Sequence, residues 1–166
     1  MRRIIAAALM VGFLSACAAS GSIQTLSGSA PAVHSAKSGA VEVSTSLPDK
    51  SETVAALKAA ITAQLVNKRM FKSITDGDSS DYLLRVDITE ISEVSQAARV
   101  LVGAFAGQAE IAANCTVIDR RDGRVIGKMV AKATSSGGHI FAGTTQEAID
   151  IVALQIVDYL LANRQL

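Results

Sequence analysis

The sequence contains no tryptophan and few other aromatic residues, with four phenylalanines and two tyrosines among 166 residues. Proteins that bind single-stranded nucleic acid stack its bases on aromatic side chains, and nucleic-acid-binding domains in general carry an excess of positive charge. Here 16 Lys and Arg residues are balanced by 15 Asp and Glu residues, for a formal net charge of +1. We therefore expect no nucleic-acid partner.

Histidine and cysteine are also scarce, with two of each. His34 and His139 lie far apart, and neither has another histidine or a cysteine nearby at the spacing of a zinc site. The segment 76–81, DGDSSD, is weakly similar to a calcium loop, but its glycine is misplaced and the bidentate glutamate is missing. No GxSxG motif accompanies His139. We expect no catalytic residues, no metal, no cofactor and no enzymatic activity.

The apolar run near the N-terminus is too short to cross a membrane. Segment 4–14 contains 11 residues, whereas a transmembrane helix needs about 20. It follows Arg2 and Arg3 and ends in small residues, the order of a secretory signal peptide. We therefore predict a signal peptide over 1–16 and export of the chain.

The end of this segment, Leu14-Ser15-Ala16-Cys17, resembles the lipobox of bacterial lipoproteins. In that family the cysteine thiol is diacylated, the chain is cut before it, and the new amino group is acylated. The resemblance implies that acyl chains on Cys17 hold the protein on a membrane. Ala18 stands where an aspartate favours inner-membrane retention in enteric lipoproteins. We therefore expect the outer membrane, with the domain facing the periplasm.

Processing at this site would change both the charge and the cysteine count. Loss of Arg2 and Arg3 leaves 14 basic against 15 acidic residues, so no basic field attracts nucleic acid. With Cys17 acylated, Cys115 has no partner for an intrachain disulfide. Cys115 alternates with apolar neighbours, and we interpret it as a small core residue. A reactive thiol or an intermolecular bridge is the alternative.

The composition changes near residue 40. Segment 17–39 is rich in serine, alanine and glycine and is typical of a flexible tether. Segment 40–166 is long enough for a single domain with one hydrophobic core. We predict a lipidated cysteine, a tether and one periplasmic domain.

Alternating apolar and polar residues predict strands, because successive side chains of a strand point to opposite faces. We predict strands at 41–46, 82–91, 108–119 and 125–134. Asp122-Gly123 separates the last two and is a typical hairpin turn, so these strands are expected to pair antiparallel.

Two segments show helical spacing of apolar residues. The first begins near Asp49, which has capping-box spacing to Glu52, and the second begins at Thr144, which has the same spacing to Glu147. The apolar positions of the first are Val54, Leu57, Ile61, Leu65 and Met70. The order β-α-β-β-β-α predicts an α+β fold, an antiparallel sheet with both helices packed on one face.

The connection between the second and third predicted strands is unusually apolar. Segment 97–107, AARVLVGAFAG, would expose Val100, Leu101, Val102 and Phe105 to water unless something covers them. One interpretation is a strand that begins early or a loop folded over the core. The other is an interaction surface for another subunit or for the membrane.

The C-terminal half carries a second resemblance. The stretches DYLLRVDITE, AGQAEI and CTVIDRRDGRVIGK, followed by a capped helix, resemble a family of small bacterial lipoproteins with a domain of unknown function. The resemblance implies an envelope lipoprotein without an assigned reaction. The predicted topology is also similar to curli-secretion lipoproteins, to the amino-terminal domain of the Tol translocation protein and to lipoprotein activators of peptidoglycan synthases, an analogy of fold alone.

Together these features favour a non-enzymatic outer-membrane lipoprotein that binds or assembles envelope proteins. Its expected partners are the membrane, through the acyl chains, and either an envelope protein or a second copy of itself. The alternative is a periplasmic carrier that holds a lipid or small ligand between its sheet and its helices.

Overall fold

The computed structural model describes residues 19–26, 33–35, 37–75, 79–93, 107–137 and 144–165. The longer strands are β1 (Ser20–Thr25), β3 (Ser38–Thr45), β5 (Tyr82–Ser92), β6 (Glu110–Asp119) and β7 (Arg124–Thr134). The short strands are β2 (Val33–His34), β4 (Ser73–Ile74) and β8 (Arg164–Gln165), and the helices are α1 (Ser51–Asn67) and α3 (Thr145–Ala162).

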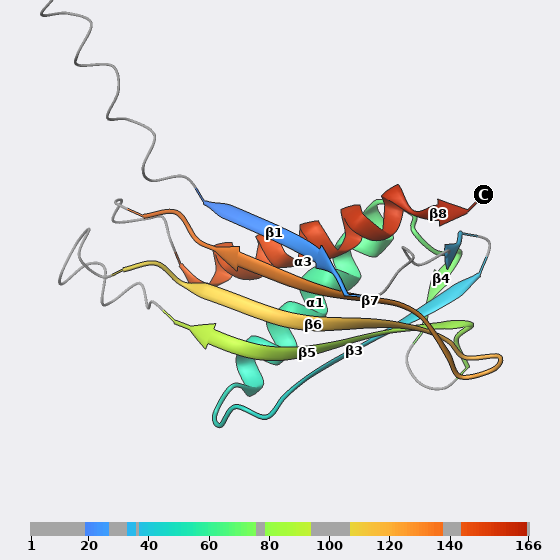
Figure 1. Ribbon diagram of the computed structural model, residues 1–166, viewed down its shortest axis with the longest axis horizontal. Helices are drawn as coiled ribbons and strands as arrows, with labels where there is room; N and C mark the ends of the chain where they lie inside the picture. The colour runs from blue at the N-terminus through green and yellow to red at the C-terminus, as the bar shows by residue number, and fades with distance from the viewer. Residues whose placement is uncertain are drawn as a thin grey trace, which may run out of the picture.

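Most of the strands form one sheet, in the order β1-β7-β6-β5-β3-β4. Helices α1 and α3 both lie on the same side of this sheet, so the domain has two layers (Figure 1). β2 and β8 pair in parallel as a separate two-stranded sheet. The α+β class and the placement of both helices on one face agree with the sequence analysis.

The alternation that predicted the strands also decides which face is covered. In β5, Leu84 and Val86 are buried, whereas Arg85 and Asp87 between them are exposed. β6 and β7 repeat the pattern. Within the predicted strands 108–119 and 125–134, every second residue of 109–117 and of 127–133 is buried on this face: Ala109, Ile111, Ala113, Cys115, Val117, Gly127, Met129, Ala131 and Ala133.

The β6–β7 hairpin closes at the predicted turn. Gly123 has a φ of 71°, a left-handed conformation that glycine adopts without the steric cost of a Cβ atom. Beside the turn, Arg121 donates to both carboxylate oxygens of Asp119, at 3.0 and 2.5 Å. This bidentate pairing lowers the pKa of the buried Asp119 carboxyl to about 2.

The sheet is mixed, which corrects the prediction of a purely antiparallel sheet. β5, β6 and β7 pair antiparallel as expected, but β3 pairs with β5 in parallel. The reason is the connection: α1 lies between β3 and β5, and a strand that returns through a helix enters the sheet in its original direction. Asp81, just before β5, accepts hydrogen bonds from the Ser38 backbone N–H and Oγ, both at 2.8 Å, and so ties the starts of the two strands together.

β1 lies in the segment that the sequence analysis interpreted as a tether, where no strand was predicted. Its residues pair antiparallel with β7, from Ser20 opposite Thr134 to Thr25 opposite Met129. Only Ile23 is partly buried, so the strand lacks the apolar alternation that revealed the others. Its position in the sheet therefore depends on backbone pairing with the edge of β7.

The two helix starts differ from each other. Thr144 caps α3 as predicted, because its side chain accepts from the Glu147 backbone N–H at 3.3 Å. The predicted cap at Asp49 is wrong: α1 begins at Ser51, its N-cap is Lys50, and Asp49 has a positive φ of 56°. A residue in that left-handed conformation belongs to the preceding turn and does not have the extended geometry of a capping residue.

The core lies between the sheet and the two helices. Large side chains from both helices have no exposed surface or almost none, and each contributes roughly 1.5–3 kcal/mol by its burial. These side chains are Leu57, Ile61 and Leu65 of α1 and Val152, Ile156 and Leu160 of α3.

Truncation of this core should be costly. We expect Leu57→Ala to lower the free energy of unfolding by about 2–5 kcal/mol, because the removed atoms leave a cavity between α1 and the sheet. Val125→Ala is the matched control, since Val125 is 44% exposed. Urea titration should show a large shift for the first variant and a small one for the second. Equal shifts would contradict this assignment of the core.

The Asp119 pair predicts a specific acid sensitivity. The pKa of this carboxyl is about 2 in the folded chain against an ordinary value of 3.8. Between these values the unfolded state binds more protons, so stability is lost as the pH falls from about 4 toward 2. Asp119→Asn should flatten that part of the stability curve, measured by thermal unfolding against pH. An unchanged curve for Asp119→Asn would contradict this role of the pair.

Candidate functional site

The residues chosen from the sequence as functional lie outside the described ranges. This holds for the lipobox Leu14-Ser15-Ala16 with Cys17, and for the candidate interaction surface of Val100, Leu101, Val102 and Phe105. Their roles therefore stay predictions. The structure does locate the residues on either side of the apolar segment.

Those flanking residues lie at one end of the sheet. Glu93 follows β5 directly, Gln108 precedes β6, and Ser92 pairs with Glu110 across the two strands. Both helices also begin at this end, beside the end of β5 (Figure 1). The chain therefore gathers two helix N-termini and both flanks of the apolar segment in one place.

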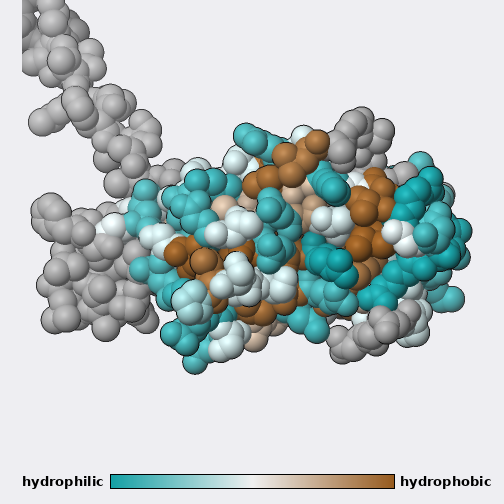
Figure 2. Space-filling view, turned by 60° about the horizontal axis from the view of Figure 1, so that its bottom comes forward, coloured by the Kyte–Doolittle hydropathy of each residue, from teal (hydrophilic) through white to brown (hydrophobic). Residues whose placement is uncertain are grey.

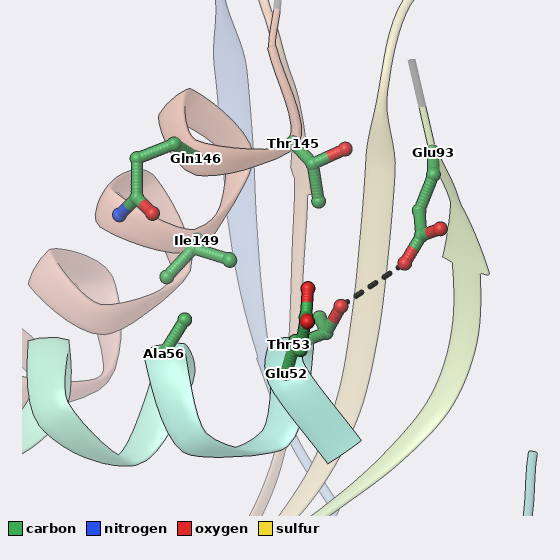
Figure 3. A pocket seen from close by; sticks show the side chains of 7 residues that line it. All are labelled: Glu52, Thr53, Ala56, Glu93, Thr145, Gln146 and Ile149. Atoms are coloured by element: carbon green, nitrogen blue, oxygen red, sulfur yellow. Dashed lines mark hydrogen bonds between the residues drawn. The ribbon is translucent and has the colours of Figure 1, made fainter. Parts of the chain in front are cut away.

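A hollow of about 290 Å³ lies at this end, and we call it the helix-end hollow. It is half polar, and Figure 3 shows side chains from α1, α3 and the end of β5 around it. They are Glu52, Thr53, Ala56, Glu93, Thr145, Gln146 and Ile149. Ala56 and Ile149 provide apolar surface between the two helices.

Glu93 is the hollow's best-anchored polar group. The Thr53 hydroxyl donates to its carboxylate at 3.0 Å, the bond drawn in Figure 3, and Lys50 Nζ lies 2.8 Å away. The Lys50 hydrogen bond is the main reason why the pKa of Glu93 is lowered, and partial burial opposes it. A carboxylate held in this way stays ionised at neutral pH. It is suited to holding structure or binding a polar group, not to donating a proton.

Cys115 is part of the core, as predicted. Its thiol is 1% exposed on the helix-facing side of β6, and burial raises its pKa to about 12. The thiolate is the reactive form of cysteine, and it is not populated at neutral pH here. The reactive-thiol alternative therefore has no support.

Two further observations concern the described part of the chain. It contains no group of three or more histidine, cysteine, aspartate or glutamate side chains placed to hold a metal ion. Neither of its helices has the length and apolarity needed to span a membrane.

A second hollow, of about 570 Å³, lies between the end of β3 and the first turns of α1. We call it the β3 groove. Its lining mixes apolar side chains with charged ones: Ser44, Thr45, Leu47, Asp49, Lys50, Ser51, Val54, Ala55 and Lys58. Figure 2 turns the lower, β3 side of the molecule forward and shows apolar patches separated by polar ones.

The groove borders an open edge of the sheet. β4 covers only the start of β3, at Ser38 and Gly39. From Ala40 to Thr45 no described strand pairs with the outer side of β3, and none pairs with the outer side of β1. The sequence pattern predicted neither β1 nor the parallel placement of β3, so neither open edge was expected.

The family of the chain follows from its sequence. The model of the family described as Domain of unknown function (DUF4410) matches residues 22–138. The chain belongs to this family. The match begins within β1 and extends beyond β7, so it covers the whole of the main sheet except the first residues of β1. No curated protein matches the sequence.

Solved structures share the fold at low sequence identity. The PelC dodecamer from Paraburkholderia phytofirmans matches with a TM-score of 0.57 and 15% identity, over 85% of this chain and 97% of that one. Protein XCC0632 from Xanthomonas campestris, of family DUF330, matches with a TM-score of 0.53 and 15% identity, over 82% and 90% of the two chains. At these identities the likeness shows the fold alone.

The burial of Cys115 can be tested directly. In a Cys17→Ala variant, Cys115 is the single remaining cysteine. It should react with a thiol reagent at pH 8 many-fold more slowly in the folded protein than in urea, because the folded thiol is both buried and protonated. Absorbance of the released chromophore measures the rate. Fast labelling without denaturant would contradict the core assignment.

Proposed function

We propose that this protein is a non-enzymatic lipoprotein of the outer membrane whose periplasmic domain associates with further copies of itself to assemble or support an envelope complex. Support for the anchor comes from the sequence. Cys17 follows Leu14-Ser15-Ala16 at the end of a signal-peptide pattern, and acyl chains on such a cysteine attach a protein without a transmembrane helix.

The observation that carries the protein-binding role is the pair of open sheet edges. An unpaired edge presents a row of backbone donors and acceptors, and monomeric proteins protect such edges with lysine, proline or bulges. β1 has no charged residue and no proline, and Glu42 is the only charged residue of β3. Edges of this kind favour pairing with another chain.

Self-association is favoured over a different partner by one comparison. A protein with this fold is described as a dodecamer, so the fold is compatible with repeated contacts between identical copies. Oligomers with closed symmetry are the commonest assemblies of identical chains. A closed oligomer of tethered domains would cover a far larger area of membrane than a single domain covers.

The carrier alternative places a ligand between the sheet and the helices. That space is occupied by packed side chains such as Leu57, Ile61 and Ile156, which have no exposed surface. The two hollows described above lie at the ends of elements, not inside this layer. No observation specifically favours a carrier, and its test is part of the experiment below.

The first test is of the anchor. Replacing Cys17 by alanine should move the protein from the membrane fraction to the soluble fraction and abolish labelling by a palmitate analogue, because the acceptor thiol is gone. Cell fractionation and labelling measure both effects. Continued membrane association and continued labelling of the Cys17→Ala variant would contradict the proposal of a lipoprotein.

The second part of the test is assembly. Native mass spectrometry of the full chain, extracted in mild detergent, should give one discrete oligomer. A monomer that retains a non-covalently bound lipid, in addition to the covalent acyl chains on Cys17, would instead support the carrier and overturn self-association. Cys115→Ser serves as the control, because its oligomer should match that of the wild type if no intermolecular disulfide is involved.

A further inference from the structure

We propose that copies of this chain join edge to edge, with β1 of one copy added to β3 of the next as an antiparallel strand. This inference rests on the self-association proposed above and specifies the surface that produces it. Three properties of the two open edges support it. These are the direction of each strand, the residues whose backbone groups are free, and the face of the sheet to which the side chains of those residues point.

The first requirement is strand direction. β1 is antiparallel to β7, β7 to β6 and β6 to β5, whereas β3 is parallel to β5. β1 therefore runs antiparallel to β3 within one copy. A neighbour placed beside it in the same orientation would bring its β1 against β3 as an antiparallel pair, with the helices of both copies on the same side of the extended sheet.

The second requirement is that the outer edge of β1 presents free backbone groups at defined residues. The Leu26 N–H donates to the Lys128 carbonyl of β7 at 2.9 Å, so the backbone groups of Leu26 point toward β7. These groups alternate in direction along a strand. The N–H and C=O groups of Gly21, Ile23 and Thr25 therefore point away from β7, toward the open edge.

The outer edge of β3 also presents free backbone groups at defined residues. The Gly39 carbonyl accepts from the Thr75 N–H at 2.9 Å, on the side away from β5. Alternation then directs the backbone groups of Val41, Val43 and Thr45 to that side as well. Beyond β4, no described strand pairs with them.

The third requirement is that paired residues share a face of the sheet. Ile23 lies opposite the buried Ala131, and Val43 opposite the buried Val86, so both strands direct their outward-bonding residues to the helix side. A one-residue slip would mismatch both the faces and the hydrogen bonds. The matching pairs are Gly21 with Thr45, Ile23 with Val43 and Thr25 with Val41.

A shift by two residues in one direction keeps the faces but places Gly21 opposite Leu47, beyond the end of β3. The opposite shift also keeps the faces but places Thr25 opposite Gly39. Gly39 is already paired with β4, through Ile74, so that register conflicts with the existing strand. The register proposed here uses only the free part of β3. It also places Leu26, which is 59% exposed, opposite the apolar Ala40.

The charges on the two edges are compatible. β1 is uncharged, and Glu42, which would lie opposite Gln24, is already paired with Arg85 and Arg120 at 3.5 and 3.3 Å. No like charges meet across the new pair. Ser22 would lie opposite Ser44, and both side chains are exposed on the face away from the helices.

The helices would extend the contact. α3 packs over β1, where Tyr159 Oη and Thr25 Oγ1 lie 2.7 Å apart. The α3 of the added copy would therefore come beside α1 and the β3 groove, which contains Val54. The contact joins two different surfaces, the β1 edge of one copy and the β3 edge of the next, so each copy can bind one neighbour on either side. Such a chain of copies closes into a ring when the rotation from one copy to the next divides a full turn evenly.

The test is a disulfide between copies. In the full-length lipidated chain, we would combine Ser22→Cys with Ser44→Cys and add copper phenanthroline. These positions form a non-hydrogen-bonded pair in the proposed register, with Cα atoms about 4.5 Å apart, within disulfide range. Inside one chain, four strand spacings of about 4.8 Å separate β1 from β3, so no internal bond forms. We expect a ladder of dimers, trimers and larger species on a denaturing gel.

The matched control moves one cysteine by two residues. Ser20→Cys with Ser44→Cys should give roughly tenfold less crosslinked product, because these positions are opposite each other only in the shifted register. The wild type should give no ladder under the same oxidant. Mixing tagged Ser22→Cys and Ser44→Cys chains should give mixed dimers.

The outcomes separate this inference from the function on which it rests. If the wild type is a discrete oligomer but Ser22→Cys/Ser44→Cys gives no ladder, or the control pair crosslinks better, the proposed contact is wrong and self-association stands. If the wild type is a monomer by native mass spectrometry, both proposals fail. A ladder from the Ser22→Cys/Ser44→Cys pair, absent from the control, supports both.

Discussion

Burial of two helices against one face of the sheet is the constraint on which the rest of this structure depends. Leu57 and Ile61 of α1 and Ile156 of α3 reach the core only if both helices lie on the same side. Because α1 also connects β3 to β5, that burial makes β3 a parallel neighbour of β5. The mixed sheet thus follows from how the helix is packed.

This arrangement determines which parts of the sheet are covered and which stay open. The helices cover one face of the sheet and leave its edges open. Three carboxylates with lowered pKa values form hydrogen bonds that hold the elements together. Asp81 joins β3 to β5, Glu93 joins the end of β5 to α1, and Asp119 braces the β6–β7 turn. Each of these three carboxylates is therefore part of what holds the fold together.

Parts of the fold were predictable because their signals are local. Period-two alternation located β5, β6 and β7 and their inward residues, Asp122-Gly123 located the hairpin, and Thr144 located the start of α3. β1 was missed because Ile23 is its only partly buried side chain, so its own residues carry little pattern. The cap predicted at Asp49 failed because spacing alone does not report backbone conformation.

What the sequence determined by itself is therefore the α+β class, the central antiparallel strands and the expectation of a lipid anchor at Cys17. Each depends on neighbouring residues, whose spacing is fixed by the chain. Tertiary structure alone decided the direction of β3, the recruitment of β1 and hence the two open edges. These depend on contacts between segments far apart in the sequence, where β7 provides backbone partners for β1 and the core draws α1 across the sheet.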